Sequence, residues 1–482
     1  MKLQEILKDI GIIHMSADSE LEISGICSDS RKAAAGGLFV AVTGFETDGH
    51  RHIPSAVEKG ACCVICEHEP EINIPYVLVK NSRSALALAS ANFYGRPADK
   101  MTMIGVTGTN GKTTSTYLLK TILESGGAKV GLIGTNQNMI GDRVLDTERT
   151  TPESNELQEL FRQMLDEGCT HVVMEVSSHA LELNRVDSVR FKVGIFTNLT
   201  QDHLDFHDTM DKYAEAKAKL FAMCDVGVLN LDDEAFEKMT GYASCKVFTY
   251  AAKSDEADLV AKNIRLKNDG VSFEALLPGS IRRIELGIPG EFSVYNALGV
   301  IGASLHLGFD LKQIEQALKN ASGVKGRVEV VPTGTDYTMI IDYAHTPDAL
   351  ENVLSAVRGF AKGRVVALFG CGGDRDGTKR SLMGAIAAKM ADFVIVTSDN
   401  PRTEEPMGII KDILEGMKDT KTPYTVIEDR RKAIRWSMDN ALPDDIIVLA
   451  GKGHETYQII GKTKTHLDER EEIAAHLQEI KG

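Results

Sequence analysis

Residues 102–114 read Thr-Met-Ile-Gly-Val-Thr-Gly-Thr-Asn-Gly-Lys-Thr-Thr, a short apolar run that passes into a glycine-rich turn. After Lys112, apolar residues recur at positions 118, 119, 122 and 123, which is helical spacing, and Gly126 and Gly127 end the pattern. A strand, a glycine-rich turn and a helix in this order favour phosphate binding, because glycines let backbone amides approach the anion and the helix N-terminus favours negative charge. The segment predicts an α/β fold with a P-loop-type nucleotide site.

The side chains of this loop fit the same interpretation. Lys112 is placed to reach the outer phosphates, and Thr113 carries a hydroxyl suited to a magnesium ion. The strict P-loop pattern has glycine at position 106, where this chain has Val106, so the match is incomplete. A purely structural turn is the alternative interpretation.

Alternating strands and helices continue beyond this helix. A further helix is predicted with Pro152 in its first turn and Gly168 beyond its end, because the apolar residues between them share one face. Strands are predicted at residues 129–133, 171–176, 193–196 and 226–229. This succession predicts a doubly wound sheet in a central domain over residues 99–327. Within that domain, we expect residues 231–295 to form an irregular α+β insertion.

Two further domains are predicted, one on either side of the central domain. Residues 1–98 combine short strands, at 37–42 and 76–79, with a helix over 84–94, and they form an N-terminal domain. Residues 328–482 are the most regular part of the chain and read as a Rossmann-like C-terminal domain with a parallel sheet covered on both faces. Its predicted strands are residues 338–341, 364–369, 393–397, 424–427 and 445–449.

A polar cluster directly follows each of four strands in the C-terminal domain. The clusters are Asp342-Tyr-Ala-His345, Gly370-Cys-Gly-Gly-Asp-Arg375, Asp399-Asn-Pro-Arg402 and Gly451-Lys-Gly-His-Glu455. In parallel sheets of this kind, ligands bind beyond the carboxyl ends of the strands, so we expect the four loops to converge on one crevice. Any one of these loops alone reads as an ordinary turn.

Composition excludes several other classes of function. The chain has 482 residues with 54 Lys and Arg against 69 Asp and Glu, a net charge of −15, which is the wrong sign for binding nucleic acid or an anionic membrane. Charged residues interrupt the first 13 residues, and no later run approaches the roughly 18 apolar residues of a membrane span. We expect a cytoplasmic monomer that acts on small molecules. The eight cysteines are predicted to be mostly free thiols. Cys63 and Cys66 form a CxxC in an apolar run and are predicted to be buried core thiols, with metal or redox chemistry as the alternative.

The segment TGTNGKTT at residues 107–114 resembles the nucleotide loop of the Mur ligase family, the ATP-dependent amide ligases of cell-wall precursor synthesis. Residues 175–179, 197–205 and 216–221 also resemble motifs of that family's central domain, and the likeness covers essentially the whole chain. The resemblance implies ATP and Mg2+ as cofactors and catalytic roles for Lys112, His203 and Lys217. It implies that Thr113, Glu175, His203 and Lys217 hold the metal, with Lys217 as a carbamate. By sequence alone, a surface or capping carboxylate, a packed histidine and an exposed lysine remain the alternatives.

The resemblance also implies two sets of substrate contacts. It assigns ATP binding to Gly108, Thr109, Asn110, Gly111, Lys112, Thr113, Thr114, Asn296, Arg327, Asp342 and His345. It assigns the UDP-sugar-peptide to Ser28, Ser30, Thr150, Thr151, Ser177 and Arg185. The chain departs from the family at Phe45, Glu46 and Arg149, where histidine, glutamine or asparagine is often found, and loop chemistry is the alternative for the N-terminal contacts.

The run Asp399-Asn-Pro-Arg402 resembles the family variant that adds meso-diaminopimelate, whereas lysine-adding relatives lack the arginine. Diaminopimelate carries a second carboxylate, which a planar guanidinium can hold through two parallel hydrogen bonds. The resemblance assigns diaminopimelate binding to Arg375, Asp399, Asn400, Pro401, Arg402, Gly451 and Glu455. It implies an ATP-dependent ligase that adds meso-diaminopimelate to UDP-N-acetylmuramoyl-L-alanyl-D-glutamate through an acyl phosphate.

Three alternative functions share parts of this pattern. An L-lysine-adding ligase of the family or a folylpolyglutamate synthetase-like ligase has the same ATP loop, although the run 399–402 and the separate first domain argue against both. A P-loop switch or motor couples ATP hydrolysis to a protein partner. A non-catalytic scaffold binds the nucleotide and forms no amide.

Overall fold

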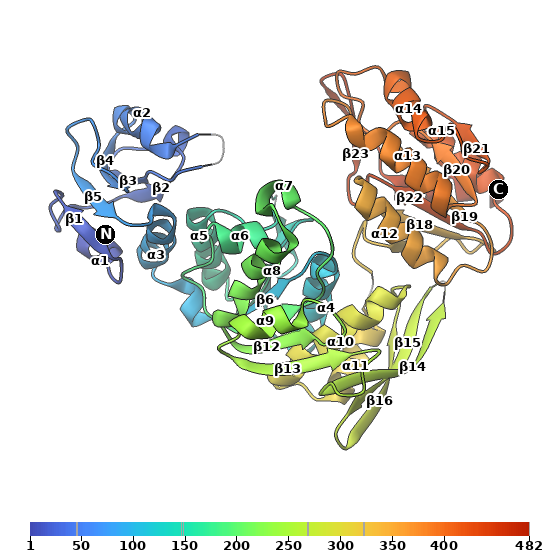
Figure 1. Cartoon of the computed structure of the whole chain (residues 1–482), viewed down its shortest axis with the longest axis horizontal. Coiled ribbons are helices and arrows are strands. Elements are labelled where there is room, and N and C mark those ends of the chain that lie inside the picture. The colour runs from blue at the N-terminus through green and yellow to red at the C-terminus, as the bar shows by residue number, and fades with distance from the viewer. Residues whose placement is uncertain (45–46, 146, 148, 268, 322, 482) are drawn as a thin grey trace. The chain divides into compact units, whose positions relative to one another are not determined.

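The computed structural model describes residues 1–44, 47–145, 147, 149–267, 269–321 and 323–481. Contacts within the chain divide it into two units, residues 1–260 with 298–314 and residues 261–297 with 315–482. Within the described residues, the strands shown in Figure 1 form sheets of five, eleven, six and two strands. No helix in the described ranges combines the length and the apolar character that crossing a bilayer requires.

The first sheet has five strands in the order β1-β5-β4-β3-β2, and only β1 runs antiparallel to its neighbour. Helices α1 and α3 cover one face, where Leu38 and Val40 pack with Leu86, and α2 covers the other, where Phe39 packs with Ile53. The strands are β1 (Ile12–Met15), β2 (Gly25–Cys27), β3 (Gly37–Val40), β4 (Ala61–Cys66) and β5 (Tyr76–Val79), and the helices are α1 (Leu3–Ile6), α2 (Ile53–Glu58) and α3 (Ser82–Phe93).

Three of the four cysteines in this sheet, Cys27, Cys63 and Cys66, are buried, and Cys62 is partly buried. Cys63 and Cys66 are fully buried in β4, and burial raises the pKa of the Cys63 thiol to about 12. All eight cysteines of the chain, each within the described ranges, are free thiols. The predicted core position of Cys63 and Cys66 is confirmed, whereas Cys62 and Cys245 are only partly buried.

The central sheet is built around β6 (Thr102–Thr107), which lies between β10 (His171–Glu175) and β11 (Phe191–Phe196) in parallel register. Helix α4 (Lys112–Ser125) packs on β6, β7 and β10, and α5 (Ser154–Asp166) packs on the other face through Phe161 and Met164. The other elements of this region are β7 (Val130–Ile133), β8 (Asn138–Ile140), β9 (Arg143–Leu145), α6 (Ser178–Glu182), α7 (Leu204–His207), α8 (Met210–Ala218), β12 (Cys224–Asn230), α9 (Phe236–Tyr242), β13 (Lys246–Ala251), α10 (Glu291–His306) and α11 (Leu311–Lys319).

Two expectations for the central region need correction. Residues 231–295 are not irregular: β13 continues the parallel sheet, and β14 (Leu259–Lys267), β15 (Gly270–Leu277) and β16 (Ser280–Leu286) extend it to eleven strands. Charged residues alternate with apolar ones along β14, because one side of this strand is exposed, and this alternation was the available signal. Helix α5 begins at Ser154 rather than at Pro152, since Glu153 remains extended with φ −64° and ψ 155°.

The C-terminal sheet contains all five predicted strands, parallel to one another, in the order β17-β18-β22-β19-β20-β21. An additional strand, β17 (Glu329–Val331), pairs antiparallel with β18 at the edge. Helices α12, α13 and α14 cover one face, and α15 and α16 cover the other. The remaining elements are β18 (Thr338–Asp342), α12 (Pro347–Arg358), β19 (Val365–Phe369), α13 (Thr378–Met390), β20 (Phe393–Val396), α14 (Pro406–Glu415), β21 (Tyr424–Val426), α15 (Arg430–Asp439), β22 (Ile446–Ala450), the hairpin β23 (Tyr457–Ile460) and β24 (Thr463–His466), and α16 (Glu469–Lys481).

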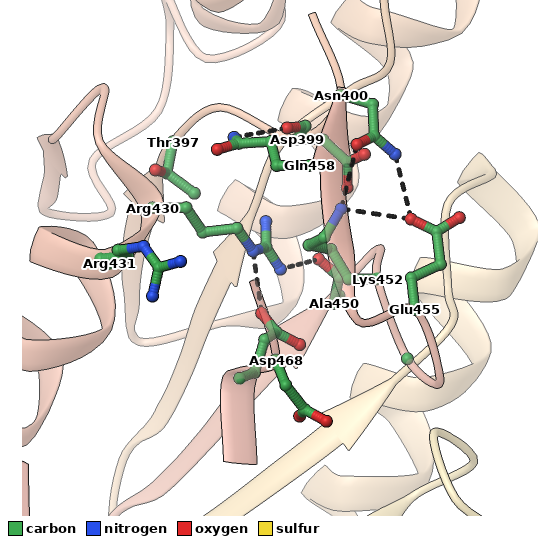
Figure 2. Close-up of polar contacts among 12 residues, drawn as sticks. Thr397, Asp399, Asn400, Arg430, Arg431, Ala450, Lys452, Glu455, Gln458 and Asp468 are labelled. Carbon is green, nitrogen blue, oxygen red and sulfur yellow. Dashed lines mark hydrogen bonds and ion pairs between the residues drawn. The ribbon is translucent and has the colours of Figure 1, made fainter. Parts of the chain in front are cut away.

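A buried ion pair ties α16 to this sheet. Arg430 Nε and Glu469 Oε1 are 2.8 Å apart, and both side chains are 0% exposed. Arg430 Nη2 also donates to the carbonyl oxygen of Ala450 at 2.9 Å, where β22 ends (Figure 2). Removal of one partner from a buried pair costs about 3–5 kcal/mol because it leaves an uncompensated charge. The last helix therefore supports the strand end that precedes Gly451.

Candidate active site

The glycine-rich turn between β6 and α4 has the backbone of a phosphate-binding loop. Gly108 has a φ of +146° and Gly111 a φ of +85°, which L side chains rarely adopt, and a Cβ at Gly108 would collide with Oγ1 of Thr197. Val106 is buried inside β6 and pairs with both neighbouring strands. The loop therefore begins after position 106, which explains why valine replaces the glycine of the strict pattern.

The end of β11 fixes the shape of this loop. The backbone nitrogen of Asn110 donates to Asn198 Oδ1 at 2.9 Å, and Thr197 Oγ1 donates to the Asn110 carbonyl at 2.6 Å. Lys112 Nζ folds back and donates to the carbonyl oxygens of Gly108 and Thr109 at 2.9 and 2.8 Å. The ammonium of Lys112 is therefore at the loop, where phosphate groups would bind.

A buried carboxylate lies beside the first turn of α4. Glu175, the last residue of β10, is 1% exposed and accepts hydrogen bonds from Thr113 Oγ1 at 2.9 Å and from Thr135 through its nitrogen and hydroxyl at 2.9 and 3.0 Å. Thr113 and Thr114 are themselves buried. Hydroxyl and carboxylate oxygens are the ligands that Mg2+ prefers, so this arrangement fits the metal. Thr135 was not identified from the sequence. It lies just beyond the end of β7, the strand that pairs with β10, and β10 ends at Glu175.

Lys217 on α8 is the second cation at the loop. Its side chain is 1% exposed, its Nζ donates to the Gly108 carbonyl at 2.8 Å, and its Nζ lies 4.3 Å from the centre of the Tyr213 ring. Burial, together with the positive charge of Lys112, holds the pKa of Lys217 well below that of an ordinary lysine. The alternative of an exposed helical lysine is wrong for this residue.

His203 lies near this cluster at the start of α7, with a φ of +51°. Its side chain is 46% exposed, its Nε2 is 3.4 Å from Asp202 Oδ2, and its ring centre is 6.1 Å from that of Tyr213. Since Tyr213 also contacts Lys217, the structure brings Lys112, Lys217 and His203 to one region of the central sheet.

Four of the residues assigned to the UDP-sugar-peptide lie around the end of β10. Thr151 Oγ1 donates to the Glu175 carbonyl at 2.8 Å, and Arg185 Nη1 donates to the Thr151 carbonyl at 3.0 Å. Ser177 caps α6 and lies within 3.3 Å of the Thr151 hydroxyl, while the Thr150 hydroxyl lies 3.0 Å from that of Thr135.

The two assigned serines of the N-terminal sheet are less closely connected. Ser28 Oγ is 3.5 Å from Asn155 Oδ1, at the start of α5. Ser30 begins a short helical turn that Asp29 caps. Phe45 and Glu46 lie outside the described residues.

Three of the assigned nucleotide contacts gather around Tyr343 in the second unit. The Arg327 guanidinium lies 5.4 Å from the Tyr343 ring centre, and His345 Nδ1 lies 2.8 Å from the Tyr343 carbonyl. Asp342 accepts the backbone N–H groups of Val328 and Ala344, each at 2.8 Å, and burial raises the pKa of its carboxyl group.

Asn296 lies on α10. Its Nδ2 is buried without an acceptor among the described residues, which fits a group that donates to a bound ligand.

The residues assigned to diaminopimelate converge beyond the carboxyl ends of β19, β20 and β22. Arg402 Nη1 donates to the Gly373 carbonyl at 2.7 Å, and Asn400 Nδ2 donates to Glu455 Oε2 at 3.0 Å. Gly372 lies between the two arginine side chains, since a Cβ there would be 2.9 Å from Arg402 Nη1 and 3.9 Å from Arg375 Cγ. The convergence of these loops agrees with the expectation from the strand pattern.

The hairpin β23–β24 shapes this site as well, although the sequence reasoning missed it. The backbone of Arg402 bridges to the hairpin, since its nitrogen donates to the Ile459 carbonyl at 3.1 Å and its carbonyl accepts from Gly461 at 2.6 Å. Pro401, which precedes this bridge, is buried. Arg402 has a left-handed backbone conformation, with a φ of +51°, at the point where it forms this bridge.

Asp399 offers a free acceptor in the same site. Its Oδ2 is buried and receives no hydrogen bond from the described residues. A Cβ on Gly451, which has a φ of +118°, would lie 2.6 Å from this oxygen. Glycine at position 451 therefore keeps the approach to the carboxylate open for a donor such as an ammonium group.

Because the family resemblance assigns an amino-acid substrate to this site, we expect Gly451→Ala to raise the KM for that substrate by about tenfold or more, since the new methyl group would block a charge-assisted hydrogen bond to Asp399. Steady-state kinetics with a varied amino acid at saturating ATP would measure the effect. Gly461→Ala is the control, since its φ of +60° is also left-handed and no atom lies within 4 Å of the position that its new methyl group would take. An equal rise in both variants would assign the effect to backbone strain.

Three family descriptions match this chain. "Mur ligase family, catalytic domain" matches residues 22–94, "Mur ligase middle domain" matches residues 106–304, and "Mur ligase, glutamate ligase domain" matches residues 326–453. The three matches include the glycine-rich loop, Lys217 and the Asp399 to Arg402 run. The division into domains at 98 and 327 stays a prediction.

Relatives match over the full length of the chain. The UDP-N-acetylmuramoyl-L-alanyl-D-glutamate–2,6-diaminopimelate ligases of Caldanaerobacter subterraneus subsp. tengcongensis and Clostridium tetani are 50% and 48% identical, with 99% and 100% of both chains covered. A solved structure of a ligase with the same name is 32% identical, with a TM-score of 0.75 over 100% of this chain and 99% of that one. By its sequence and its three-dimensional structure, this chain belongs to the Mur ligase family.

Proposed function

We propose that this protein joins meso-diaminopimelate to the D-glutamate side chain of UDP-N-acetylmuramoyl-L-alanyl-D-glutamate, with conversion of ATP to ADP and phosphate. A carboxylate does not acylate an amine at neutral pH, because oxide is a very poor leaving group. Transfer of the γ-phosphoryl group to the carboxylate gives an acyl phosphate and ADP. The amine of diaminopimelate then attacks the acyl carbon, and phosphate leaves as the amide forms. No covalent enzyme nucleophile is needed.

The role of the first unit in this proposal is to bind the nucleotide and the acyl acceptor. Lys112, at the loop, neutralises charge on the phosphates, and Thr151, Ser177 and Arg185 hold the muramoyl peptide. Thr113, Glu175, His203 and carbamylated Lys217 would hold Mg2+, which supplies further charge neutralisation when bound. Catalysis on this proposal is mainly positioning and electrostatic stabilisation.

The environment of Lys217 supports its carbamylation. Only a neutral amine adds to CO2, with the loss of one proton, and the lowered pKa of Lys217 increases the neutral fraction of its amine. The carbamate is an anionic oxygen ligand, whereas an unmodified ammonium beside Lys112 and a magnesium ion would repel both. Burial disfavours the charged form of Lys217, so this residue is suited to become a metal ligand.

The observation that carries the choice of amino acid is the combination of charges beyond β19, β20 and β22. The Arg402 guanidinium lies next to Gly372, which the Arg375 side chain approaches with its Cγ, and Asp399 and Glu455 provide acceptors in the neighbouring loops. A substrate with a carboxylate and an ammonium group at each end matches this set. L-Lysine lacks the carboxylate at the far end, so it offers no group for the Arg402 guanidinium to bind.

Phosphate release from ATP with the UDP-muramoyl dipeptide tests this function, with meso-diaminopimelate, L-lysine or no amine added. We expect release and a tripeptide product by mass spectrometry with diaminopimelate and much less of both with lysine. Preference for lysine would assign the enzyme to the lysine-adding ligases. ATP hydrolysis that needs neither the dipeptide nor an amine would favour a switch or motor, and binding of ATP without turnover would favour a scaffold.

We also propose that the enzyme acts as a cytoplasmic monomer. Residues of a single chain supply every group that the proposed reaction uses, which supports the monomer. The net charge of −15 gives the chain no attraction to an anionic membrane surface. Sedimentation velocity of the purified enzyme with its substrates would measure the oligomeric state.

A further inference from the structure

Lys452 is a fully buried cation in the loop that follows β22. Its side chain is 0% exposed, and its Nζ donates to Asn400 Oδ1 at 3.1 Å and to Glu455 Oε2 at 3.2 Å (Figure 2). A buried ammonium is costly unless such partners compensate it. The partners of Lys452 are both residues that we assign to the amino-acid site, while Lys452 itself has no assigned role.

The contacts of Asn400 determine which way its amide faces. Asn400 Oδ1 accepts from Lys452 Nζ and also from the backbone nitrogen of Ile459 at 2.9 Å. Two donors therefore hold the oxygen end of the amide, and Asn400 Nδ2 is left to donate to Glu455 Oε2 at 3.0 Å. Lys452 thus contributes to the orientation of Asn400 as well as to that of Glu455.

Lys452 and Asn400 consequently hold one of the two oxygens of Glu455, and the Tyr457 hydroxyl also forms a hydrogen bond with this carboxylate. Lys452 Nζ and Asn400 Nδ2 both bind Oε2, which fixes the rotation of the carboxylate and the direction of Oε1 (Figure 2). The Glu455 side chain is 14% exposed, unlike that of Lys452, so the carboxylate lies at the boundary between the buried network and the site. A fixed carboxylate binds a substrate ammonium without losing side-chain entropy at that moment.

We infer that Lys452 is a positioning residue for amino-acid selection: it fixes Glu455, directly and through Asn400, so that Glu455 accepts a hydrogen bond from the far ammonium of the substrate. This inference rests on the proposed function. Lys452 does not touch the substrate, so its effect depends on Glu455 and on the presence of the far ammonium group. It differs in this respect from Arg402, which acts on the far carboxylate.

A set of three amines separates these effects. Lys452→Met keeps the length of the side chain and removes its charge, and we expect it to raise the KM for meso-diaminopimelate by about tenfold or more. 2-Aminopimelate retains the far carboxylate but lacks the far ammonium, so its KM should change little. L-Lysine retains the far ammonium and lacks the far carboxylate, so its KM should rise as the KM for diaminopimelate does. The KM for ATP should remain unchanged in all assays.

A double-mutant cycle tests whether Lys452 acts through Glu455. We expect Glu455→Gln and the double variant Lys452→Met with Glu455→Gln to have the same KM for diaminopimelate. Once Glu455 is replaced, Lys452 has no carboxylate left to position. Further loss in the double variant would overturn the inference. This comparison also decides the matter if Lys452→Met alone fails to fold, since the double variant leaves no unpaired buried carboxylate.

Lys464→Met is the matched control. Lys464 is an exposed lysine whose Nζ lies 3.7 Å from the ring centre of Tyr457, a ring that Lys452 Nζ approaches at 5.7 Å. We expect this variant to keep the wild-type KM for all three amines. Equal increases for diaminopimelate and 2-aminopimelate in Lys452→Met, or no increase for either, would refute a role through the far ammonium. Failure of the wild-type enzyme to couple diaminopimelate would refute the proposed function instead.

Discussion

Lys217→Ala is expected to lose ligase activity by a factor of about a hundred to a thousand or more, the loss typical of removing a principal electrostatic group from an active site. The variant lacks both the buried amine at the Gly108 carbonyl and the carbamate that we propose it forms. ATP-dependent phosphate release in the presence of the dipeptide and diaminopimelate would measure the loss. The effect should appear mainly in kcat, because the group acts on the phosphoryl-transfer step.

Rescue distinguishes a missing ligand from a damaged fold. Added formate or acetate can enter the space that Lys217 leaves and supply a carboxylate oxygen, so activity should partly return with either anion. In the wild-type protein, isotopically labelled CO2 should give a carbamate signal that the variant lacks. Full activity in Lys217→Ala would remove the carbamate from the mechanism.

Lys219 provides the control for this experiment. It lies two positions further along the same segment, its side chain is 41% exposed, and it pairs with Glu182 at 2.6 Å on the surface. Exposed pairs of this kind contribute only about 0–1 kcal/mol to stability. Lys219→Ala should therefore keep nearly full activity and should not respond to added carboxylates.

Arg402→Ala is expected to raise the KM for meso-diaminopimelate by roughly 30-fold to nearly 1,000-fold, which corresponds to about 2 to 4 kcal/mol for a lost charge-assisted pair. The far carboxylate loses its guanidinium partner, while the nucleotide loop is unchanged, so the KM for ATP should stay near its wild-type value. Initial rates at varied diaminopimelate and saturating ATP would measure this shift.

Two comparisons strengthen the test of Arg402. Coupling of L-lysine should be nearly insensitive to Arg402→Ala, because lysine has no far carboxylate, so the preference for diaminopimelate should fall. Arg358→Ala is the control, since Arg358 is 42% exposed and pairs with Asp392 at 2.8 Å at the end of α12. Unchanged diaminopimelate kinetics in Arg402→Ala would refute the assigned role.

The sequence was most informative where strands and loops have local signatures. Apolar runs located the five parallel strands of the C-terminal sheet, and the polar residues that follow them located the loops that meet at its carboxyl edge. The same reasoning missed β14, β15 and β16, because strands with one exposed side carry charged residues such as Arg265 that obscure an apolar run. A period of two along the chain was the only signal.

The side-chain network of the site could not be predicted in the same way. Lys452 lies between two glycines in a loop that by itself reads as an ordinary turn, so no signal in the sequence marks this lysine as buried. Its burial depends on Asn400 and Glu455, and Asn400 lies 52 positions away in the chain. The resemblance to the family pointed to Asn400 and Glu455, whereas the cation that holds them emerges only when the loops are brought together.

The contacts of Arg430 with Glu469 and with the Ala450 carbonyl also make the amino-acid site depend on a residue that lies beyond all of its loops in the sequence. The ribosome makes Glu469 after every loop that contributes to the amino-acid site, and until then the guanidinium of Arg430 has no carboxylate to neutralise it in the interior. In a chain that lacks Glu469, the loop that begins at Gly451 should be less firmly fixed. Such a chain should therefore bind the amino acid less tightly, because the end of β22 loses the support of the last helix.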